Sequence, residues 1–164
     1  MKKILVIGCP GSGKSTFARS LHEITDIPLF YLDRMYWNAD KTTVQKAVFL
    51  DRLADALNRE QWIIDGNYAS TMEMRMKECD TVIFLDYHTD ICLEGIRQRQ
   101  GKARSDIPWI ETEEDEEFIS FVRNFAENGR PKITELLDKY SDKNVVTFKA
   151  RREAEEFLKR MKHK

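Results

Sequence analysis

The segment that most constrains the fold is a short apolar run that breaks into glycines near the amino terminus. Residues 3–8 read KILVIG, residues 8–15 read GCPGSGKS, and an amphipathic helical pattern follows. Residues 8–15 match G-x-x-x-x-G-K-[ST] at every specified position and lie between a strand pattern and a helix pattern. Such a loop directs successive backbone N–H groups toward an anion at the start of a helix. The sequence therefore predicts a phosphate-binding turn, or P-loop, after the first strand.

Each polar position of the P-loop has an expected role. Lys14 is expected to place a mobile charge on the outer phosphates and to act in catalysis, and the Ser15 hydroxyl to help hold Mg²⁺. Thr16 is expected to bond another phosphate. The predicted ATP-binding residues of this segment are Gly8, Pro10, Gly11, Ser12, Gly13, Lys14, Ser15 and Thr16.

Five short apolar segments alternate with helical patterns along the chain. They are β-branched or aromatic, end at turn residues, and occupy residues 3–8, 27–33, 62–66, 81–87 and 144–150. Such segments predict buried strands, and their alternation with helices is typical of a parallel sheet covered on both faces. The chain has 164 residues without an internal repeat or a low-complexity linker, so we expect a single α/β domain over residues 1–164.

Composition restricts the partners. The formal net charge is -1, which disfavours direct DNA binding because such binding usually needs a basic face. No apolar run approaches the ~18 residues of a membrane span, and the apolar start is too short for a signal peptide. The three cysteines show no paired spacing, which suits a reducing compartment. We therefore expect a cytoplasmic protein without a membrane partner.

Three aspartates follow predicted strands, at the sheet edge where ligands of parallel sheets collect. Any of them can simply cap the next helix. Magnesium on a nucleoside triphosphate needs a carboxylate near the P-loop serine. Asp65 is preferred because Gly66 lets the chain approach the phosphates, and Asp86 is the rival. Asp33 precedes an aromatic segment and is predicted to orient or deprotonate an acceptor hydroxyl.

The motif identifies bound phosphates rather than a reaction. The chain has no N-K-x-D sequence to read guanine and no aspartate followed three places later by glycine, which argues against a signalling GTPase. It is also too short for most motor or transporter ATPases. Small kinases and their relatives remain.

The order of motifs resembles one known family. The chain is similar to the bacterial topology-modulation (FlaR-like) proteins, which are adenylate-kinase-related P-loop proteins, over nearly its whole length. The resemblance rests on the P-loop, LDRMYW, WIIDGNY, DTVIFLDY, IRQRQGKARSD and FVRNFAENGRPKI. It implies a three-layer P-loop NTPase fold with a five-stranded parallel sheet of order 2-3-1-4-5. It also implies an acceptor-side arm at about residues 34–60, a short lid at about residues 99–116, and Asp65 beside the P-loop.

Phosphoryl transfer depends on positioning and on neutralising the charge of the moving group. Two arginines of the lid, Arg99 and Arg104, are therefore catalytic candidates, the alternative being solvated surface charges. Arg151 follows the last strand, where related kinases pack the adenine, and is a predicted nucleotide contact. The predicted acceptor-side residues are Asp33, Tyr36, Asn67, Tyr68 and Arg75.

Several points stay open. Tyr36 either stacks on a base or sugar or packs in the core. Gly95 stands four residues before Arg99, where adenylate kinases carry a second arginine, and Asp65-Gly66-Asn67-Tyr68 replaces their D-G-F-P-R sequence. These departures make adenosine monophosphate doubtful as the acceptor.

The sequence thus predicts an ATP- and Mg²⁺-dependent kinase whose partner is a small-molecule phosphoryl acceptor: a nucleotide, a nucleoside or another metabolite. One alternative is a slow ATPase that acts as a regulatory switch linked to DNA topology or to a protein partner. Another is a nucleotide-binding module without catalysis. The oligomeric state is open.

Overall fold

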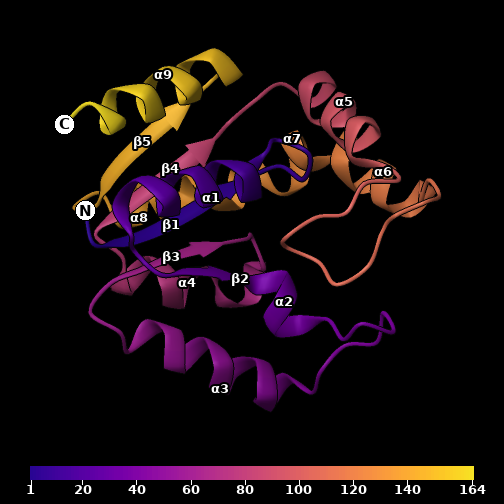
Figure 1. The fold of residues 1–164 in the computed structure, drawn as a ribbon, viewed down its shortest axis with the longest axis horizontal. Helices are drawn as coiled ribbons and strands as arrows, with labels where there is room; N and C mark the ends of the chain where they lie inside the picture. The colour runs from indigo at the N-terminus through magenta and orange to yellow at the C-terminus, as the bar shows by residue number, and fades with distance from the viewer.

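The computed structural model describes residues 1–164 and is built on one parallel sheet with helices on both faces (Figure 1). The strand order is β2-β3-β1-β4-β5, so the predicted order 2-3-1-4-5 is confirmed. The strands are β1 (Lys3–Gly8), β2 (Leu29–Tyr31), β3 (Trp62–Asp65), β4 (Thr81–Leu85) and β5 (Asn144–Phe148).

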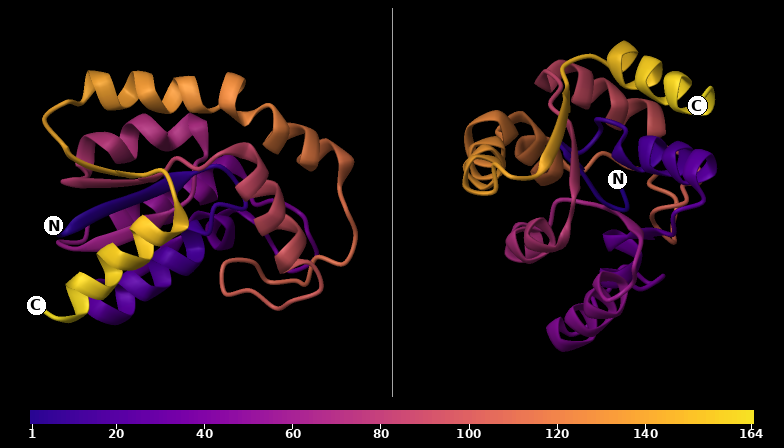
Figure 2. Two further views of the ribbon diagram at one scale, coloured as in Figure 1. Left: turned by 90° about the horizontal axis from the view of Figure 1, so that it is seen from above. Right: turned by 90° about the vertical axis from the view of Figure 1, so that its left-hand side faces the viewer.

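The helices form the outer layers of the sandwich. They are α1 (Lys14–Thr25), α2 (Leu32–Tyr36), α3 (Lys46–Leu57), α4 (Ala69–Glu78), α5 (Thr89–Arg99), α6 (Glu116–Arg123), α7 (Phe125–Asn128), α8 (Arg130–Lys139) and α9 (Arg151–Lys162). Helices α1 and α9 pack together on one face of the sheet, and α4 and α8 on the other (Figure 2). Helices α5 and α6 lie beyond the carboxyl ends of the strands (Figure 1). No helix combines the length and the apolar character that crossing a membrane would require.

The central strand explains the continuous apolar run at the start of the chain. Residues Ile4 to Ile7 of β1 are fully buried, because β1 pairs with β3 on one side and β4 on the other and is covered on both faces. A strand in this position has no solvent face and therefore no alternation of polar residues. The chain leaves β1 at Gly8, and the P-loop follows at the carboxyl edge of the sheet.

Two strands differ from the prediction. Strand β2 ends at Tyr31, so Asp33 lies in the first turn of α2 rather than at the end of a strand. Strand β5 was expected to be buried, but it is an edge strand that pairs only with β4, and Val145 is 37% exposed. An apolar run by itself does not distinguish a central strand from an edge strand.

Helix α5 packs directly against the P-loop because both elements carry glycine at the contact. A Cβ on Gly95 would lie 2.0 Å from the Gly11 carbonyl oxygen, and a Cβ on Gly11 would lie 2.0 Å from the Cys92 carbonyl oxygen. A larger residue at either position would push the helix away. This contact explains why no arginine stands four residues before Arg99, the last residue of α5.

Candidate functional site

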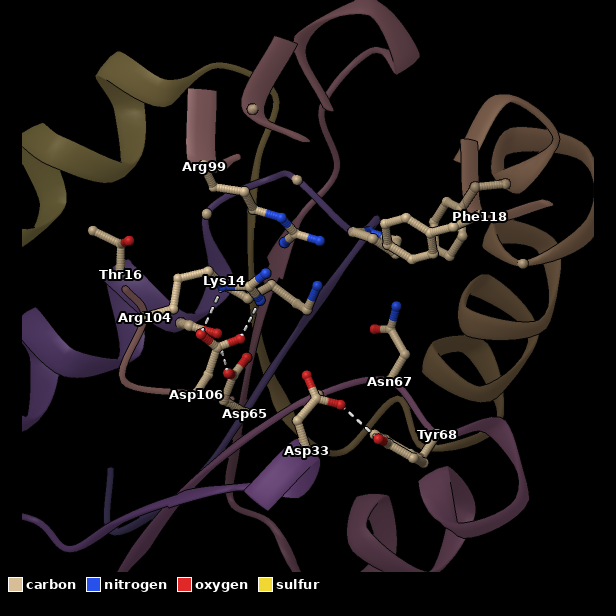
Figure 3. A pocket seen from close by; sticks show the side chains of 18 of the residues that line it. Lys14, Thr16, Asp33, Asp65, Asn67, Tyr68, Arg99, Arg104, Asp106 and Phe118 are labelled. Atoms are coloured by element: carbon tan, nitrogen blue, oxygen red, sulfur yellow. Dashed lines mark hydrogen bonds and ion pairs between the residues drawn. The ribbon is translucent and has the colours of Figure 1, made fainter. Parts of the chain in front are cut away.

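A cavity of about 870 Å³ opens at the carboxyl edge of the sheet (Figure 3). Its walls come from the P-loop and α1, the β3–α4 turn, α5 with the segment that follows it, and helices α6 to α8. Most of the predicted site residues line it: Pro10, Gly11, Gly13, Lys14, Ser15, Thr16, Asp33, Asp65, Asn67, Tyr68, Arg99, Arg104 and Arg151. Residues from distant parts of the chain therefore share one cavity.

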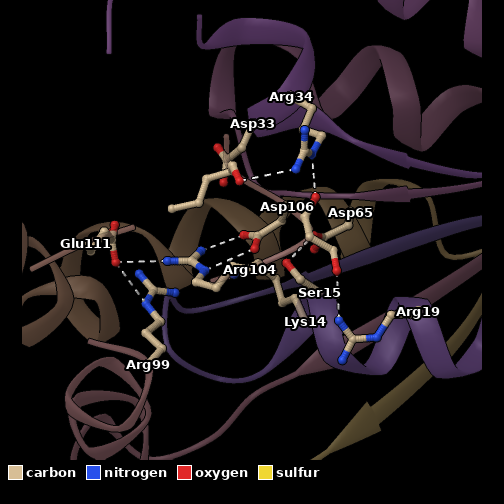
Figure 4. A network of polar contacts seen from close by, with 12 residues as sticks. Lys14, Ser15, Arg19, Asp33, Arg34, Asp65, Arg99, Arg104, Asp106 and Glu111 are labelled. Carbon is tan, nitrogen blue, oxygen red and sulfur yellow. Dashed lines mark hydrogen bonds and ion pairs between the residues drawn. The ribbon is translucent and has the colours of Figure 1, made fainter. Parts of the chain in front are cut away.

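The predicted magnesium pair forms a direct contact. The Ser15 hydroxyl donates to Oδ2 of Asp65 at 2.5 Å (Figure 4). Oδ1 of Asp65 is buried and has no hydrogen-bond partner, which leaves an oxygen ligand free beside the P-loop. Burial raises the pKa of Asp65 to about 6, against the opposing effect of the Lys14 charge. A hard divalent cation fits this donor set, because it takes oxygen ligands and would stabilise the ionised carboxylate.

Asp86, the other candidate for the magnesium-binding carboxylate, is bound by two basic side chains. Asp86 accepts two hydrogen bonds from Arg130, both 2.8 Å long, and a third from Lys149. It does not line the cavity. Asp86 therefore ties the end of β4 to α8 and to the residue after β5.

The raised pKa of Asp65 leads to a prediction about stability without metal. The pKa of Asp65 rises from 3.8 in the unfolded chain to about 6 in the folded protein. The protonated carboxyl therefore contributes fully to folding stability below about pH 4, and this contribution is lost as the pH rises through about 6. The total loss is on the order of 3 kcal/mol at most. We expect wild type to lose stability relative to Asp65→Asn between about pH 4 and about pH 7, measured by urea unfolding without Mg²⁺. A pH-independent difference between the two proteins would contradict the burial of this charge.

Lys14 is the first residue of α1, and its side chain points into the cavity (Figure 3). Its ammonium group lies 3.3 Å from the Cys9 carbonyl oxygen, inside the loop. It is also close enough to favour the ionised forms of both Asp33 and Asp65. This position suits a cation that would contact the outer phosphates of a bound nucleotide.

Asp33 is held by a tyrosine of the β3–α4 turn. The Tyr68 hydroxyl donates to Oδ1 of Asp33 at 2.5 Å. Burial raises the pKa of Asp33, and the bond from Tyr68 partly offsets this effect. The side-chain amide of Asn67 binds the first P-loop residue, donating to the Gly8 carbonyl at 2.6 Å and accepting from its N–H at 3.1 Å. The turn thus connects the P-loop to the carboxylate of α2.

Two acceptor-side predictions need correction, and the first is Arg75. This side chain was expected to grip an anionic acceptor, but it is fully buried and does not line the cavity. Its guanidinium donates to the carbonyls of Gly66 at 2.8 Å, of Asn67, and of Tyr68 at 3.1 Å. Tyr68 has a left-handed backbone with φ of 37°, a costly conformation for a residue with a side chain. Arg75 stabilises this turn and does not face a ligand.

The second correction is Tyr36, which packs behind the cavity wall. Its ring lies 5.2 Å from that of Tyr68 and 5.5 Å from that of Phe49, and Tyr36 does not line the cavity.

Two predicted nucleotide-binding residues of the P-loop, Gly8 and Ser12, also lie outside the cavity lining. Gly8 carries the contacts to Asn67, and the hydroxyl of Ser12 is buried without a partner.

The segment that joins α5 to α6, here called the lid segment (residues 100–115), has no helix or strand and crosses the site. Arg19 of α1 donates to the Ser105 hydroxyl at 3.1 Å. Arg34 of α2 donates to the carbonyl of Ser105 and, at 3.3 Å, to that of Ile107. The lid segment is therefore attached to both α1 and α2.

The two catalytic arginine candidates lie in the cavity with their charges paired. Arg104 donates to Oδ1 of Asp106 at 3.0 Å and to Glu111 at 2.9 Å (Figure 4). Arg99 forms an ion pair with the same Glu111 oxygen at 3.5 Å. Burial disfavours the ionised form of Asp106, but the bonds from Arg104 outweigh this and lower its pKa. Asp106 and Glu111 therefore pair the charges of both arginines within the cavity.

Arg151, the predicted nucleotide contact, stands at the start of α9. Its guanidinium donates to the carbonyls of Ser12 and Gly11, both at 3.0 Å. It also lies 5.5 Å from the Tyr87 ring. Arg151 lines the cavity and supports the P-loop through these carbonyls.

Sequence reasoning missed several lining residues. Asp106 is 4% exposed, and the only signal for it was its position two residues after Arg104. An apolar wall of six residues is formed by Met72, Phe118, Phe121, Phe125, Ile133 and Leu136. The three phenylalanines are spaced by three and four residues, a signal for one helical face, and this face lines the cavity.

A P-loop at the start of a helix, in a parallel sheet of this order, defines a P-loop protein with the fold that solved shikimate kinases also have. The family described as an AAA domain (AAA_18) matches residues 4–119, and the chain belongs to this family.

Two solved structures show the same fold. Shikimate kinase from Bacteroides thetaiotaomicron has 20% sequence identity and a TM-score of 0.57, with 98% of this chain and 95% of that chain covered. Shikimate kinase from Acinetobacter baumannii, in complex with shikimate, has 16% identity and a TM-score of 0.64, with 98% and 93% covered. No curated protein sequence shows significant similarity to this chain.

Proposed function

We propose that this protein is an ATP- and Mg²⁺-dependent kinase that phosphorylates a hydroxyl group of a small molecule. The observation that carries the proposal is that one cavity holds both Lys14 with the Ser15–Asp65 pair and the carboxylate of Asp33. The first group is suited to a phosphoryl donor and the second to an acceptor. The fold shared with shikimate kinases supports a small acceptor.

On the donor side, the P-loop would bind the phosphates through its backbone N–H groups, with Lys14 on the outer ones. Ser15 and Asp65 would hold Mg²⁺, because the free Oδ1 of Asp65 is an oxygen ligand beside the serine hydroxyl. When bound, the ion neutralises charge on the phosphates.

On the acceptor side, Asp33 would accept the proton of the attacking hydroxyl. Its Oδ1 is held by Tyr68, which leaves Oδ2 for the acceptor. Burial raises its pKa, and a carboxylate with a raised pKa is a stronger base. Arg99 and Arg104 would stabilise the transferring group after exchanging Asp106 and Glu111 for phosphate oxygens.

Turnover of ATP with a panel of nucleosides, nucleotides and hydroxylated metabolites tests the proposal. We expect ADP formation that depends on an acceptor, with a phosphorylated product identified by mass. In Asp33→Asn, kcat should fall by about 10²- to 10⁴-fold, as for loss of a general base, while ATP binding persists. Asp51→Asn, an exposed carboxylate change on α3, is the control. Equal kcat values in Asp33→Asn and wild type would exclude the assigned role of Asp33.

A second candidate is a regulatory switch that hydrolyses ATP slowly. The observation in its favour is that the lid arginines are already paired with lid carboxylates, so their charge is not free for turnover. We propose membership of the bacterial topology-modulation (FlaR-like) proteins and a cytoplasmic location for either candidate. A link to DNA topology or to a protein partner belongs to the switch alone. Slow hydrolysis that no acceptor accelerates would favour the switch over the kinase.

A further inference from the structure

We propose that Asp106 of the lid segment competes with the phosphates of ATP for Arg104 and so inhibits nucleotide binding until the lid segment is released. The inference concerns regulation of the same site and rests on the donor side of the proposed function, in which phosphates bind at the P-loop. It follows from the position of Asp106, from the contacts that hold it there, and from the pairing of the lid arginines.

Asp106 lies deep in the site although it belongs to an irregular segment. It is 4% exposed and lines the cavity, and both close views place its carboxylate beside that of Asp65 (Figure 3 and Figure 4). The pKa values of Asp65 and Asp33 are raised mainly by burial, and the charge of Asp106 adds to the rise in both. Asp106 is thus a third carboxylate beside the residues proposed to hold Mg²⁺ and the acceptor.

The chain is anchored on both sides of Asp106. Arg34 of α2 donates to the carbonyl of Ser105 and, at 3.3 Å, to that of Ile107. Arg19 of α1 donates to the Ser105 hydroxyl at 3.1 Å. These contacts fix the backbone immediately before and after Asp106, so that its carboxylate stays in the cavity.

Asp106 neutralises a cation that a nucleotide would need. Arg104 donates to both oxygens of Asp106, at 3.0 Å and 2.5 Å, and to Glu111 at 2.9 Å. These three residues are here called the latch. The side chains of Arg104 and Asp106 are 14% and 6% exposed, so solvent screens their attraction only weakly. Phosphate oxygens can therefore take over this guanidinium only when its two-pronged contact with Asp106 breaks.

Breaking this contact affects the whole lid segment. A buried carboxylate without a cation is strongly disfavoured, and nearby phosphates would add repulsion between like charges. Once Arg104 binds phosphate, Asp106 must therefore leave the cavity, and the anchored residues 105–107 must move with it. A nucleotide that binds only the released arrangement has an apparent affinity reduced in proportion to the fraction of molecules that are released.

Loss of the Asp106 charge tests the inference. Binding of a non-hydrolysable ATP analogue with Mg²⁺ is measured by calorimetry at about 0.15 M salt, where distant charges are screened. We expect Asp106→Asn, which keeps the size of the side chain, to bind the analogue about tenfold more tightly than wild type, as if about nine in ten wild-type molecules were latched. Glu113→Gln is the control, because it removes one negative charge from an exposed position of the lid segment and should leave Kd unchanged.

A second variant weakens the anchor and leaves the cavity lining intact. Arg34 is exposed and does not line the cavity, so Arg34→Met should fold. Loss of its bonds to the carbonyls on both sides of Asp106 should release the latch more often and tighten binding by about threefold. Removal of a positive charge would by itself weaken the binding of an anion, so tighter binding reports release of the latch. Arg123→Met, a change of an exposed arginine on α6, is the control and should leave Kd unchanged.

The inference and the kinase fail in different ways. If Asp106→Asn binds the analogue no more tightly than wild type, the inference is overturned, and Asp106 instead holds Arg104 ready for phosphate. Unchanged affinity in Arg34→Met would overturn the role of the anchor, and this variant decides alone if Asp106→Asn does not fold. The expected gains in affinity without a phosphorylated product from any acceptor would overturn the kinase and keep the latch. If none of these proteins binds the analogue, the inference is overturned.

Discussion

Lys14→Ala is expected to lower kcat by about 10²- to 10³-fold, as for removal of one preorganised group that stabilises charge in the transition state. The ammonium group lies inside the P-loop, 3.3 Å from the Cys9 carbonyl, where it would meet the outer phosphates. Charge that develops on the transferring group is stabilised most by a cation already held in place. Purified wild type and variant should be compared by acceptor-dependent ADP formation.

The matched control for this change is Lys159→Ala. Lys159 is an exposed lysine of α9 that does not line the cavity, so the same loss of charge should leave kcat unchanged. Circular dichroism should show that both variants are folded. Turnover in Lys14→Ala equal to that of wild type would remove Lys14 from the mechanism.

Arg75→Met is expected to destabilise the fold by about 3 kcal/mol or more, because it leaves buried carbonyls without donors. For a chain of this length the loss corresponds to a decrease in Tm of roughly 6–12 °C. Methionine keeps much of the side-chain volume, so the change tests the hydrogen bonds to Gly66, Asn67 and Tyr68. Because Tyr68 bonds to Asp33, KM for the acceptor should also rise.

Arg123→Met is the control for Arg75→Met, since Arg123 is exposed on α6. Its Tm should stay within about 2 °C of wild type, as for most surface substitutions. Thermal unfolding followed by circular dichroism gives both values. A Tm for Arg75→Met as high as that of the control would show that these carbonyls do not depend on the guanidinium.

Local patterns predicted the elements of the fold. The P-loop is contiguous, so its spacing could be read directly, and five apolar segments marked the five strands. The strand order came from the family resemblance. Strand ends and edge strands were harder to predict from the sequence. Whether an apolar run is central or at an edge, and where it ends, depends on which strands pair with it. The pairing partners therefore decided both where β2 ends and how exposed β5 is.

The candidate site could be predicted in part. Asp65 was preferred because Gly66 follows it, and the family resemblance placed it beside the P-loop. It lies next to Ser15 although the two residues are 50 positions apart in the sequence. The partners of the arginines could not be read in the same way. Arg75 binds carbonyls of an irregular turn, and Arg104 binds Asp106 in a segment without helix or strand. Neither segment has a periodicity that predicts where its side chains point.

The sequence by itself determined the P-loop, the alternation of strands and helices, and a chain that can fill one α/β domain, because these depend on residue order and on the period of apolar residues. Only the tertiary structure decided which charges are free. It paired Asp86 with Arg130, 44 positions away, and bound Arg151 to Gly11, 140 positions away. It also turned the phenylalanines of α6 and α7 toward the cavity. Contacts across such distances form only when the chain folds back on itself, and they decide which charged side chains can meet a ligand.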